Sequence, residues 1–392
     1  MINSVFKNFN SLLRFIPLID KWLIEQLIPP LIFSISAFTV VSLSVGVMFD
    51  LIRKIVEFGL PLTLAIKILF LKLPGFLVLS FPMSVLLSTL LTYGKLSSHS
   101  ELLALKSLGI KTSRFIVPAI IISIFMTGLT FFFNNSLVPY SNKLAEISMR
   151  DGLGKSKIIE TGNDVFFPGY GSLTDPKTNK TSERNNYLTQ IFFSRVVENK
   201  IMKNVTLLDF SRIGNKQVLS AERASFAQEK SGWIFNNGKI VNFSPDGQTS
   251  IINFEEYFYP LGDGPLKVSE IQKDANDMTI AEAIAAKNIY ENSGNIKEAR
   301  KMKVRIQEKF TLPCACLVFG LIGSSLGSKS NLRSSKSQGF GLSVILILIY
   351  YVMSFVFSSF GVKGLLTPII AAWLPVLISL GGGIYLLRKS SL

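Results

Sequence analysis

The sequence predicts a helical membrane protein with an inserted all-β domain. Six transmembrane helices form two groups of three, with an extracytoplasmic β-jelly-roll between the third and fourth helices. Each of six apolar stretches reaches the length of about 20 residues that a helix needs to cross a hydrocarbon core about 30 Å thick. A long polar segment separates the third stretch from the fourth. The apolar stretches are 27–50, 72–94, 112–138, 306–327, 340–360 and 366–387.

The positive charge of the chain lies in its membrane part. The formal net charge is +15. Residues 139–297 carry 19 basic and 19 acidic side chains, whereas the rest carries 22 basic and seven acidic ones. Basic residues beside apolar spans are typical of contacts with lipid headgroups. The charge therefore predicts a membrane protein and no nucleic-acid partner.

The ends of the chain are expected in the cytoplasm. Residues 1–21 place Lys7, Arg14 and Lys21 among apolar side chains, which is typical of a basic helix at the membrane interface. No cleavable secretory signal precedes the first span. With both termini inside, the short inner connections carry 12 basic residues and the short outer ones carry five. The positive-inside rule favours this orientation, which places the polar segment outside the cytoplasm.

The polar segment reads as short strands that alternate apolar and polar residues, which suggests a β-sandwich or jelly roll. Residues 173–186 read as a mobile loop, and a helical pattern opens at Thr279 and resumes at 296–309. The strands are expected near 158–159, 186–195, 202–209, 216–221, 232–243 and 250–258, with hairpin-type turns at 236–238, 245–247 and 263–265.

Three divisions of the chain follow from these elements. Residues 1–138 hold the N-terminal amphipathic helix, spans one to three and a short helix near 98–110. Residues 139–278 are expected to form the β domain outside the cytoplasm. Residues 279–392 hold a connecting helix and spans four to six.

No motif for catalysis, metal binding or nucleotide binding is present in the sequence. The stretch 323–330 resembles a phosphate-binding loop, but Ser328 stands where that loop requires glycine before its lysine. Cys314 and Cys316 lie two apart on a predicted helix and point in different directions, so a disulfide between them is not expected. The lone His99 is expected to be exposed. We therefore expect no catalytic residue, metal or cofactor in this chain.

The connection between spans two and three predicts a short helix with an apolar face. Ser98 or Ser100 can cap it, and Gly109 can end it. Leu102, Leu105 and Leu108 are expected to share one face. That face either lies on the membrane surface or docks on a partner protein, as a coupling helix would.

This connection resembles the E-L-x-A-L-(R/K)-x-x-G-(I/V) motif of the lipopolysaccharide-export permeases (LptF/LptG, also called YjgP/YjgQ). The motif positions are Glu101, Leu102, Ala104, Leu105, Lys106, Gly109 and Ile110. Further landmarks agree in order along the chain: Pro82-Met83 in span two, Trp233 to Gly238, Pro313 in span four and Pro375 in span six. The resemblance covers essentially the whole chain.

The resemblance implies the membrane core of an ATP-driven ABC-type exporter. Two six-helix permeases, either two copies or a pair of paralogues, would sit over a cytoplasmic ATPase dimer that binds ATP and Mg²⁺. They would extract lipopolysaccharide or a related glycolipid from the inner membrane and pass it to a periplasmic β-jelly-roll bridge. Glu101, Leu102, Ala104, Leu105 and Gly109 would couple the permease to the ATPase. The alternative is a non-transporting scaffold whose β domain binds an envelope partner.

Basic residues near the outer ends of the spans are candidates for binding the lipid headgroup, because basic side chains suit phosphate. They are Arg53, Lys54, Lys67, Lys72, Arg305 and Lys309. Two alternatives remain: these side chains reach ordinary phospholipid headgroups, or Asp50, Glu57 and Glu308 neutralise them.

Overall fold

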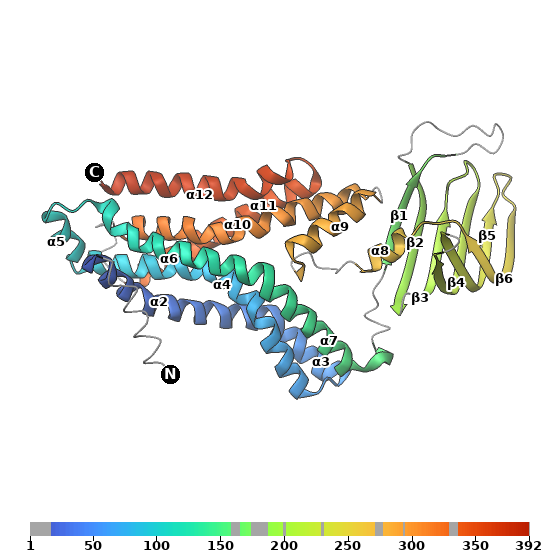
Figure 1. The fold of residues 1–392 in the computed structure, drawn as a ribbon, viewed down its shortest axis with the longest axis horizontal. Helices are drawn as coiled ribbons and strands as arrows, with labels where there is room; N and C mark the ends of the chain where they lie inside the picture. The colour runs from blue at the N-terminus through green and yellow to red at the C-terminus, as the bar shows by residue number, and fades with distance from the viewer. Residues whose placement is uncertain are drawn as a thin grey trace. The chain divides into compact units, whose positions relative to one another are not determined.

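The computed structural model describes residues 17–157, 165–173, 187–198, 201–228, 231–270, 277–292, 295–328 and 336–391. The chain divides into two compact units, one formed by Met1–Ser148 with Val304–Leu392 and the other by Met149–Lys303 (Figure 1). Most of the predicted N-terminal interfacial helix, the strand expected at 158–159 and nearly all of the loop expected at 173–186 lie outside the described residues.

The first unit is a helical bundle, and six helices in its described part are long and apolar enough to cross a membrane. The six predicted spans are thus confirmed. The helical segments are α2 (Leu18–Leu43), the π-helical η2 (Ser44–Met48), α3 (Phe49–Phe58), α4 (Leu62–Ser98), α5 (Glu101–Ser107), α6 (Thr112–Phe132), the π-helical η3 (Phe133–Leu137), α7 (Val138–Lys157), α10 (Ile296–Gly327), α11 (Lys336–Lys363) and α12 (Pro368–Ser391).

Small and hydroxylic side chains bring the helices of the bundle together. Helix α4 lies against α2, α6 and α11. Three glycines of α10 meet side chains of α4 and α6 so closely that an added methyl group would overlap them, as is usual for tightly packed membrane helices. The contacts are Gly320 with Ser123, Gly323 with Thr89 and Gly327 with Tyr93. Gly323 and Gly327, which the phosphate-loop pattern includes, therefore serve helix packing.

The first three helical stretches are longer than a bilayer requires. They contain 41, 37 and 37 residues, which at about 1.5 Å per residue gives lengths of about 55–60 Å. The predicted spans cover only their apolar parts. The first and third of these stretches contain the π-helical segments η2 and η3. In α4, Gly75 faces Val138 just beyond η3, and Phe76 packs on Gly46 of η2. The two π-helical segments thus lie at a common level of the bundle, beside Gly75 and Phe76 of α4.

The second unit contains a six-stranded antiparallel sheet in which each strand pairs with the next along the chain. Two helices follow it, α8 (Gly264–Glu270) and α9 (Ile280–Asn292). The described strands form one sheet, where a sandwich would have two. The strands are β1 (Val165–Gly171), β2 (Tyr187–Glu198), β3 (Ile201–Asp209), β4 (Lys216–Ala227), β5 (Gly232–Phe243) and β6 (Thr249–Tyr259).

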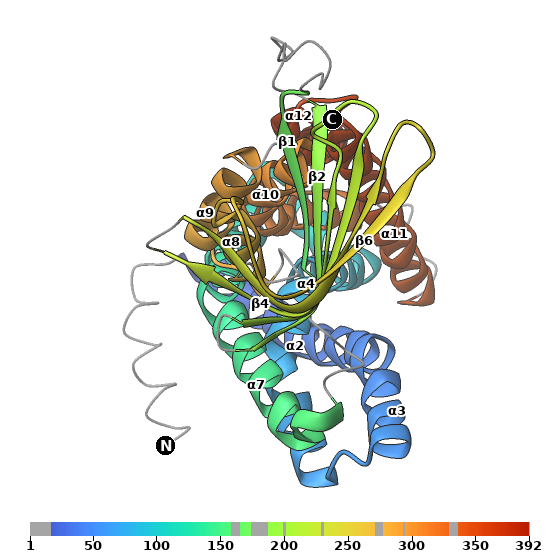
Figure 2. The same ribbon diagram turned by 90° about the vertical axis from the view of Figure 1, so that its right-hand side faces the viewer.

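The single sheet bends sharply along one row of residues. Ser194 pairs with Val205 and Val196 with Lys203, so Arg195 lies opposite Asn204 between them. The same row continues through Glu222, Asn237 and Glu255, and all five side chains in it are exposed. Asn204 and Asn237 have φ of 51° and 53°, a left-handed conformation that asparagine tolerates better than most residues. Figure 2 shows the strongly curved sheet that results.

The bent sheet encloses its own core. Phe192, on one side of the bend, lies with its ring centroid 5.0 Å from that of Trp233, on the other side. Buried residues from both halves form one cluster that includes Val165, Phe192, Met202, Leu219, Trp233, Phe235 and Leu261. One folded sheet thus buries an apolar interior as two facing sheets would.

Two of the three predicted turns are wrong. Residues 236–238 lie inside β5, where Asn237 forms the bend, and residues 263–265 lead into α8. The turn at 245–247 is confirmed: the Ser244 N–H donates to the Gln248 carbonyl at 3.0 Å, and Gly247 has φ of 76°. Strand β1 is not predicted by the sequence pattern, because Pro168 and its neighbouring glycines are atypical of a strand.

Candidate functional site

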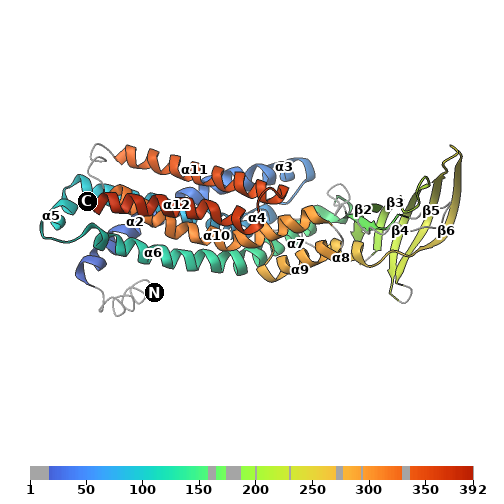
Figure 3. The same cartoon turned by 90° about the horizontal axis from the view of Figure 1, so that it is seen from above.

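The connection between α4 and α6 folds as the short helix α5, at the same end of the bundle as the C-terminal turns of α12 (Figure 3). We call this end the α5 end. Ser100 has φ of 60° and forms no side-chain cap, and the Ser98 hydroxyl donates to the Lys95 carbonyl instead. The predicted serine cap is therefore wrong. Gly109, with φ of 83°, follows the helix end as predicted.

Helix α5 has an inward and an outward side. Leu102, 3% exposed, and Leu105 pack in a cluster with Leu23, Tyr93 and Phe115 of the same chain. The expectation that Leu108 shares this face is wrong, because Leu108 is 75% exposed. Residues that share one face of a helix lie three or four positions apart, so the outward side of α5 carries different residues from the inward side. It consists of Glu101, Leu103, Ala104 and Leu108, of which Glu101 is half-buried and the others are exposed.

Hydrogen bonds fix the helices around α5. The Tyr93 hydroxyl donates to the Phe115 carbonyl. The Arg114 guanidinium at the start of α6 donates two hydrogen bonds to Asp20 near the start of α2, at 2.7 and 2.6 Å. The Asp20 side chain is 6% exposed. His99 is exposed as expected, with Nδ1 3.5 Å from a Glu101 carboxylate oxygen. Helix α5 therefore projects a small mixed surface from a rigid base.

Three of the six basic candidates for headgroup binding form ion pairs with neighbours on their own helices. Arg53 Nε lies 2.9 Å from Glu57, Lys54 Nζ 2.7 Å from Asp50, and Arg305 Nη1 2.6 Å from Glu308. Asp50, Glu57 and Glu308, the acidic residues that the sequence analysis gave as alternative partners, thus all form these ion pairs.

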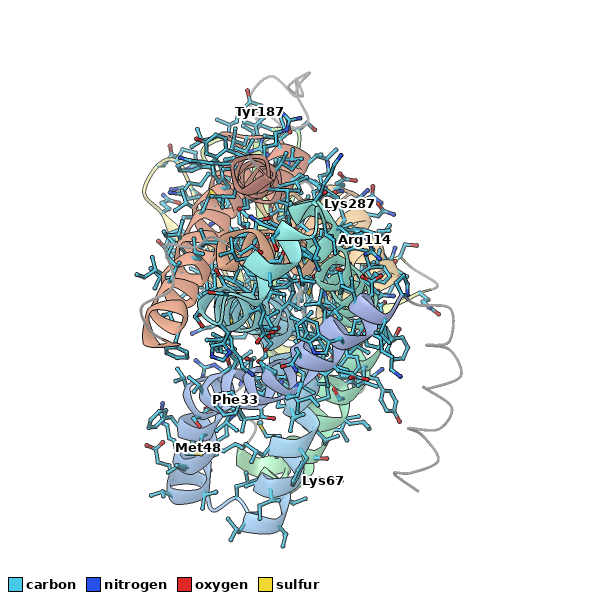
Figure 4. The ribbon with its side chains drawn as sticks, turned by 90° about the vertical axis from the view of Figure 1, so that its left-hand side faces the viewer. Phe33, Met48, Lys67, Arg114, Tyr187 and Lys287 are labelled. Carbon is cyan, nitrogen blue, oxygen red and sulfur yellow. The ribbon has the colours of Figure 1, made fainter. Side chains whose placement is uncertain are left out.

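The other three candidates differ from one another. Lys309 is 5% exposed, and its ammonium group donates to the Asn134 carbonyl in η3 at 3.3 Å. Lys67 is exposed and Lys72 is half-buried, and within the described residues neither forms an ion pair. Figure 4 labels Lys67 on α4, together with Phe33 and Met48 on the neighbouring segments α2 and η2.

Lys67, Lys72 and Lys309 lie near one level of the bundle. Gly320 of α10 meets Val85 of α4 and Gly327 meets Tyr93, so the two helices run in the same direction and Lys309 lies near the level of Pro74. At about 1.5 Å per residue, this level is about 3 Å from that of Lys72 and about 10 Å from that of Lys67. Lys67 and Lys72, which form no ion pair within the described residues, are the candidates for binding an external anion.

The β unit contains a polar network and an open edge. Gln190 donates to the Tyr259 hydroxyl, which donates to Asp209, so β2, β6 and β3 are tied across the bend. Burial, together with the hydrogen bond to Asp209, raises the pKa of Tyr259. Among the described strands β6 pairs only with β5, and its Ile251 and Ile252 are 65% and 52% exposed. A free edge with exposed apolar residues is suited to pairing with another strand.

The fold and these surfaces define a polytopic helical membrane protein with an inserted β domain. Among the described residues no group of three or more metal-binding side chains occurs. The profile of the lipopolysaccharide export system permease LptF/LptG matches residues 21–389, so the chain belongs to this family. No curated protein matches it. Family membership makes it a component of lipopolysaccharide export and a transporter subunit rather than an enzyme.

Proposed function

We propose that this chain is a permease subunit of an ATP-driven ABC-type exporter that extracts lipopolysaccharide or a related glycolipid from the inner membrane. Helix α5 carries the proposal. Its exposed side presents Glu101, Ala104 and Leu108, while Leu102 and Leu105 anchor it to the bundle. A short helix with one anchored and one exposed side is suited to transmit force from a docked partner.

The partner at the α5 end is a cytoplasmic ATPase dimer, which binds the ATP and Mg²⁺ that this chain lacks the motifs to hold. Both termini are then cytoplasmic, and residues 139–278 lie in the periplasm. A second six-helix permease, either a copy or a paralogue, completes the membrane part. Exposed apolar side chains on α2 and α11 support that pairing: Phe33, Val41, Leu348 and Phe355 are each more than 60% exposed.

The bent β domain passes the lipid to a periplasmic β-jelly-roll bridge. Its open β6 edge supports this proposal, because an incoming strand could continue the sheet and keep the apolar interior continuous. At the membrane end of the path, Lys67 and Lys72 would contact the phosphates of the headgroup.

The proposal is tested by purifying the chain in mild detergent with its native partners and identifying every bound protein and lipid by mass spectrometry. We expect an ATPase, a second permease and a glycolipid. Glu101→Lys should abolish both ATPase association and lipid export without unfolding the permease. Glu222→Lys, an exposed charge reversal on the interior strand β4 of the β unit, is the matched control.

If Glu101→Lys keeps its ATPase and exports lipid at the wild-type rate, the coupling assignment is wrong. Purification of the chain with envelope proteins alone would instead favour the scaffold.

A further inference from the structure

An ion pair at the α5 end joins two helices that are distant in sequence. Asp20 lies in the first turn of α2, and Arg114 lies in the first turn of α6, 94 residues further on. Both carboxylate oxygens of Asp20 accept from the two Nη atoms of Arg114. This forked geometry fixes the relative orientation of the two side chains as well as the distance between them, which a single contact to an ammonium group would not do.

The same place is where α2 meets the base of α5. Leu23 and Leu27, one and two turns after Asp20, belong to the cluster that buries Leu102, Tyr93 and Phe115. The Thr92 hydroxyl of α4 also donates to the Gln26 carbonyl of α2, at 3.4 Å. Helix α2 is therefore held to the base of α5 by apolar packing, one long hydrogen bond and the forked ion pair.

The covalent path from α5 to α2 is much longer. It runs the whole length of α4 (Leu62–Ser98), turns near Gly59 at the opposite end of the bundle, and returns through α3 and η2. Helices α4 and α6, by contrast, adjoin α5 directly in sequence. A displacement of α5 thus reaches α4 and α6 through the backbone, but reaches this end of α2 through side chains.

Helix α2 bears a wide apolar surface. Its outer side chains Phe33, Val40 and Val41 are each at least 60% exposed, and Val45 of η2 is 72% exposed. A movement of α2 therefore changes the surface that this chain offers to lipid or to a second permease.

We propose that Asp20 and Arg114 are positioning residues that transmit movement of α5 to α2 during transport. The inference rests on the proposed function, because it requires a partner that moves α5. Apolar packing alone resists separation of two helices but permits sliding, whereas the forked pair, whose carboxylate is buried, resists both. Neither residue contacts lipid or ATPase in this assignment.

Asp20→Asn is the variant that tests the proposal. It preserves the shape of the side chain and removes its charge, and Arg114, whose side chain is 38% exposed, can then turn to water. The alternative change, Arg114→Gln, would leave the buried Asp20 carboxylate without its cationic partner and would destabilise the fold. Asp263→Asn is the matched control, because it removes an exposed ion pair with Lys267 in the β unit.

The measurements are made on the permease pair with its ATPase in proteoliposomes that contain lipopolysaccharide. Association with the ATPase, hydrolysis of ATP and lipid extracted per ATP are recorded for each variant. For Asp20→Asn we expect normal association and hydrolysis, with extraction per ATP lowered by about fivefold or more, as for a typical coupling between sites. Asp20→Glu should restore most of the extraction, and Asp263→Asn should match the wild type.

Wild-type extraction per ATP in Asp20→Asn would overturn the proposal. If Asp20→Asn does not assemble, Arg114→Lys, which keeps the charge but not the fork, replaces it. Failure of both variants to assemble would mean that the pair serves folding alone, and this too would overturn the proposal. A wild-type complex that binds no ATPase and extracts no lipid would instead refute the proposed function.

Discussion

Lys309 and Lys67 both lie on membrane-spanning helices, yet their surroundings are opposite. Lys309 is 5% exposed and donates to a carbonyl of the π-helical η3. A π-helical turn disrupts the regular ladder of backbone hydrogen bonds, so an outside donor stabilises it. Lys67 is exposed, and no such contact forms among the described residues. A lysine near the end of a span can thus be either a structural group or a free cation.

Lys309→Met should therefore lower the stability of the purified permease by about 1–3 kcal/mol, the cost of an unpaired buried polar group. Lys67→Met should leave the melting temperature unchanged and weaken the binding of lipopolysaccharide. Both properties are measurable on one detergent preparation, by thermal unfolding and by photo-crosslinking of the lipid. Equal melting temperatures for the two variants would contradict the structural role of Lys309.

The raised pKa of Tyr259 predicts that the stability of the β unit depends on pH. Burial and the hydrogen bond to Asp209 raise its pKa above that of an unfolded tyrosine, which is about 10. The unfolded chain therefore loses this proton at a lower pH than the folded chain does. Its contribution to stability is fully present below about pH 10 and falls as the pH rises further.

In Tyr259→Phe this contribution is absent at every pH. The variant should unfold more easily than the wild type by about 1 kcal/mol at neutral pH, and the difference should shrink above about pH 10. Melting temperatures of the full chain across this range measure it. A difference that stays constant with pH would argue against the raised pKa.

At the scale of elements, the two sides of α5 have different roles. One side packs the helix against the bundle, and the other is the proposed contact with the ATPase. Leu102→Ala should destabilise the permease by about 2–5 kcal/mol, as large-to-small changes in a core do. Leu108→Ala should change stability by less than about 0.5 kcal/mol but weaken ATPase association. Thermal unfolding and co-purification distinguish the two effects. Loss of association without loss of stability in Leu102→Ala would reverse the assignment of the two sides.

In the β unit, a sequence that is typical of a hairpin turn lies inside a continuous strand. The Asn236-Asn237-Gly238 sequence is a typical hairpin signal, yet β5 continues through it. Asn204 of β3 and Asn237 of β5 lie in one row and adopt the same left-handed conformation. A positive φ within a strand bends it, and the shared row bends the whole sheet.

At the scale of the whole molecule, we expect the two units to meet different partners. Helix α5 belongs to the first unit and the open edge of β6 to the second. A defect at one surface should therefore leave binding at the other intact.

Ile252→Lys should abolish association with a periplasmic β-jelly-roll bridge while the ATPase remains bound, because a charge on an edge strand opposes strand pairing. Ile213→Lys is the matched control, since Ile213 lies outside β6 with almost the same exposure, 53% against 52%. Pull-down of both partners from one preparation measures the outcome. Wild-type bridge binding by Ile252→Lys would exclude the β6 edge as the contact.

The sequence by itself determined the class of the protein. The length of an apolar helix that crosses a bilayer is set by the bilayer, so six spans can be counted without a structure. The neutral charge of residues 139–297 against the basic remainder separated the inserted domain from the membrane part. The family motif around Glu101 marked the connection that became α5, and the profile match to residues 21–389 confirmed the family.

Only the tertiary structure decided which face of each element is buried. Leu102 and Leu108 belong to one short apolar pattern, but packing against Leu23 and Phe115 buries only the first. The Asp20–Arg114 pair joins residues 94 positions apart, and no local pattern encodes that distance. Side-chain roles of this kind depend on which helices become neighbours, and that is settled when the whole bundle packs.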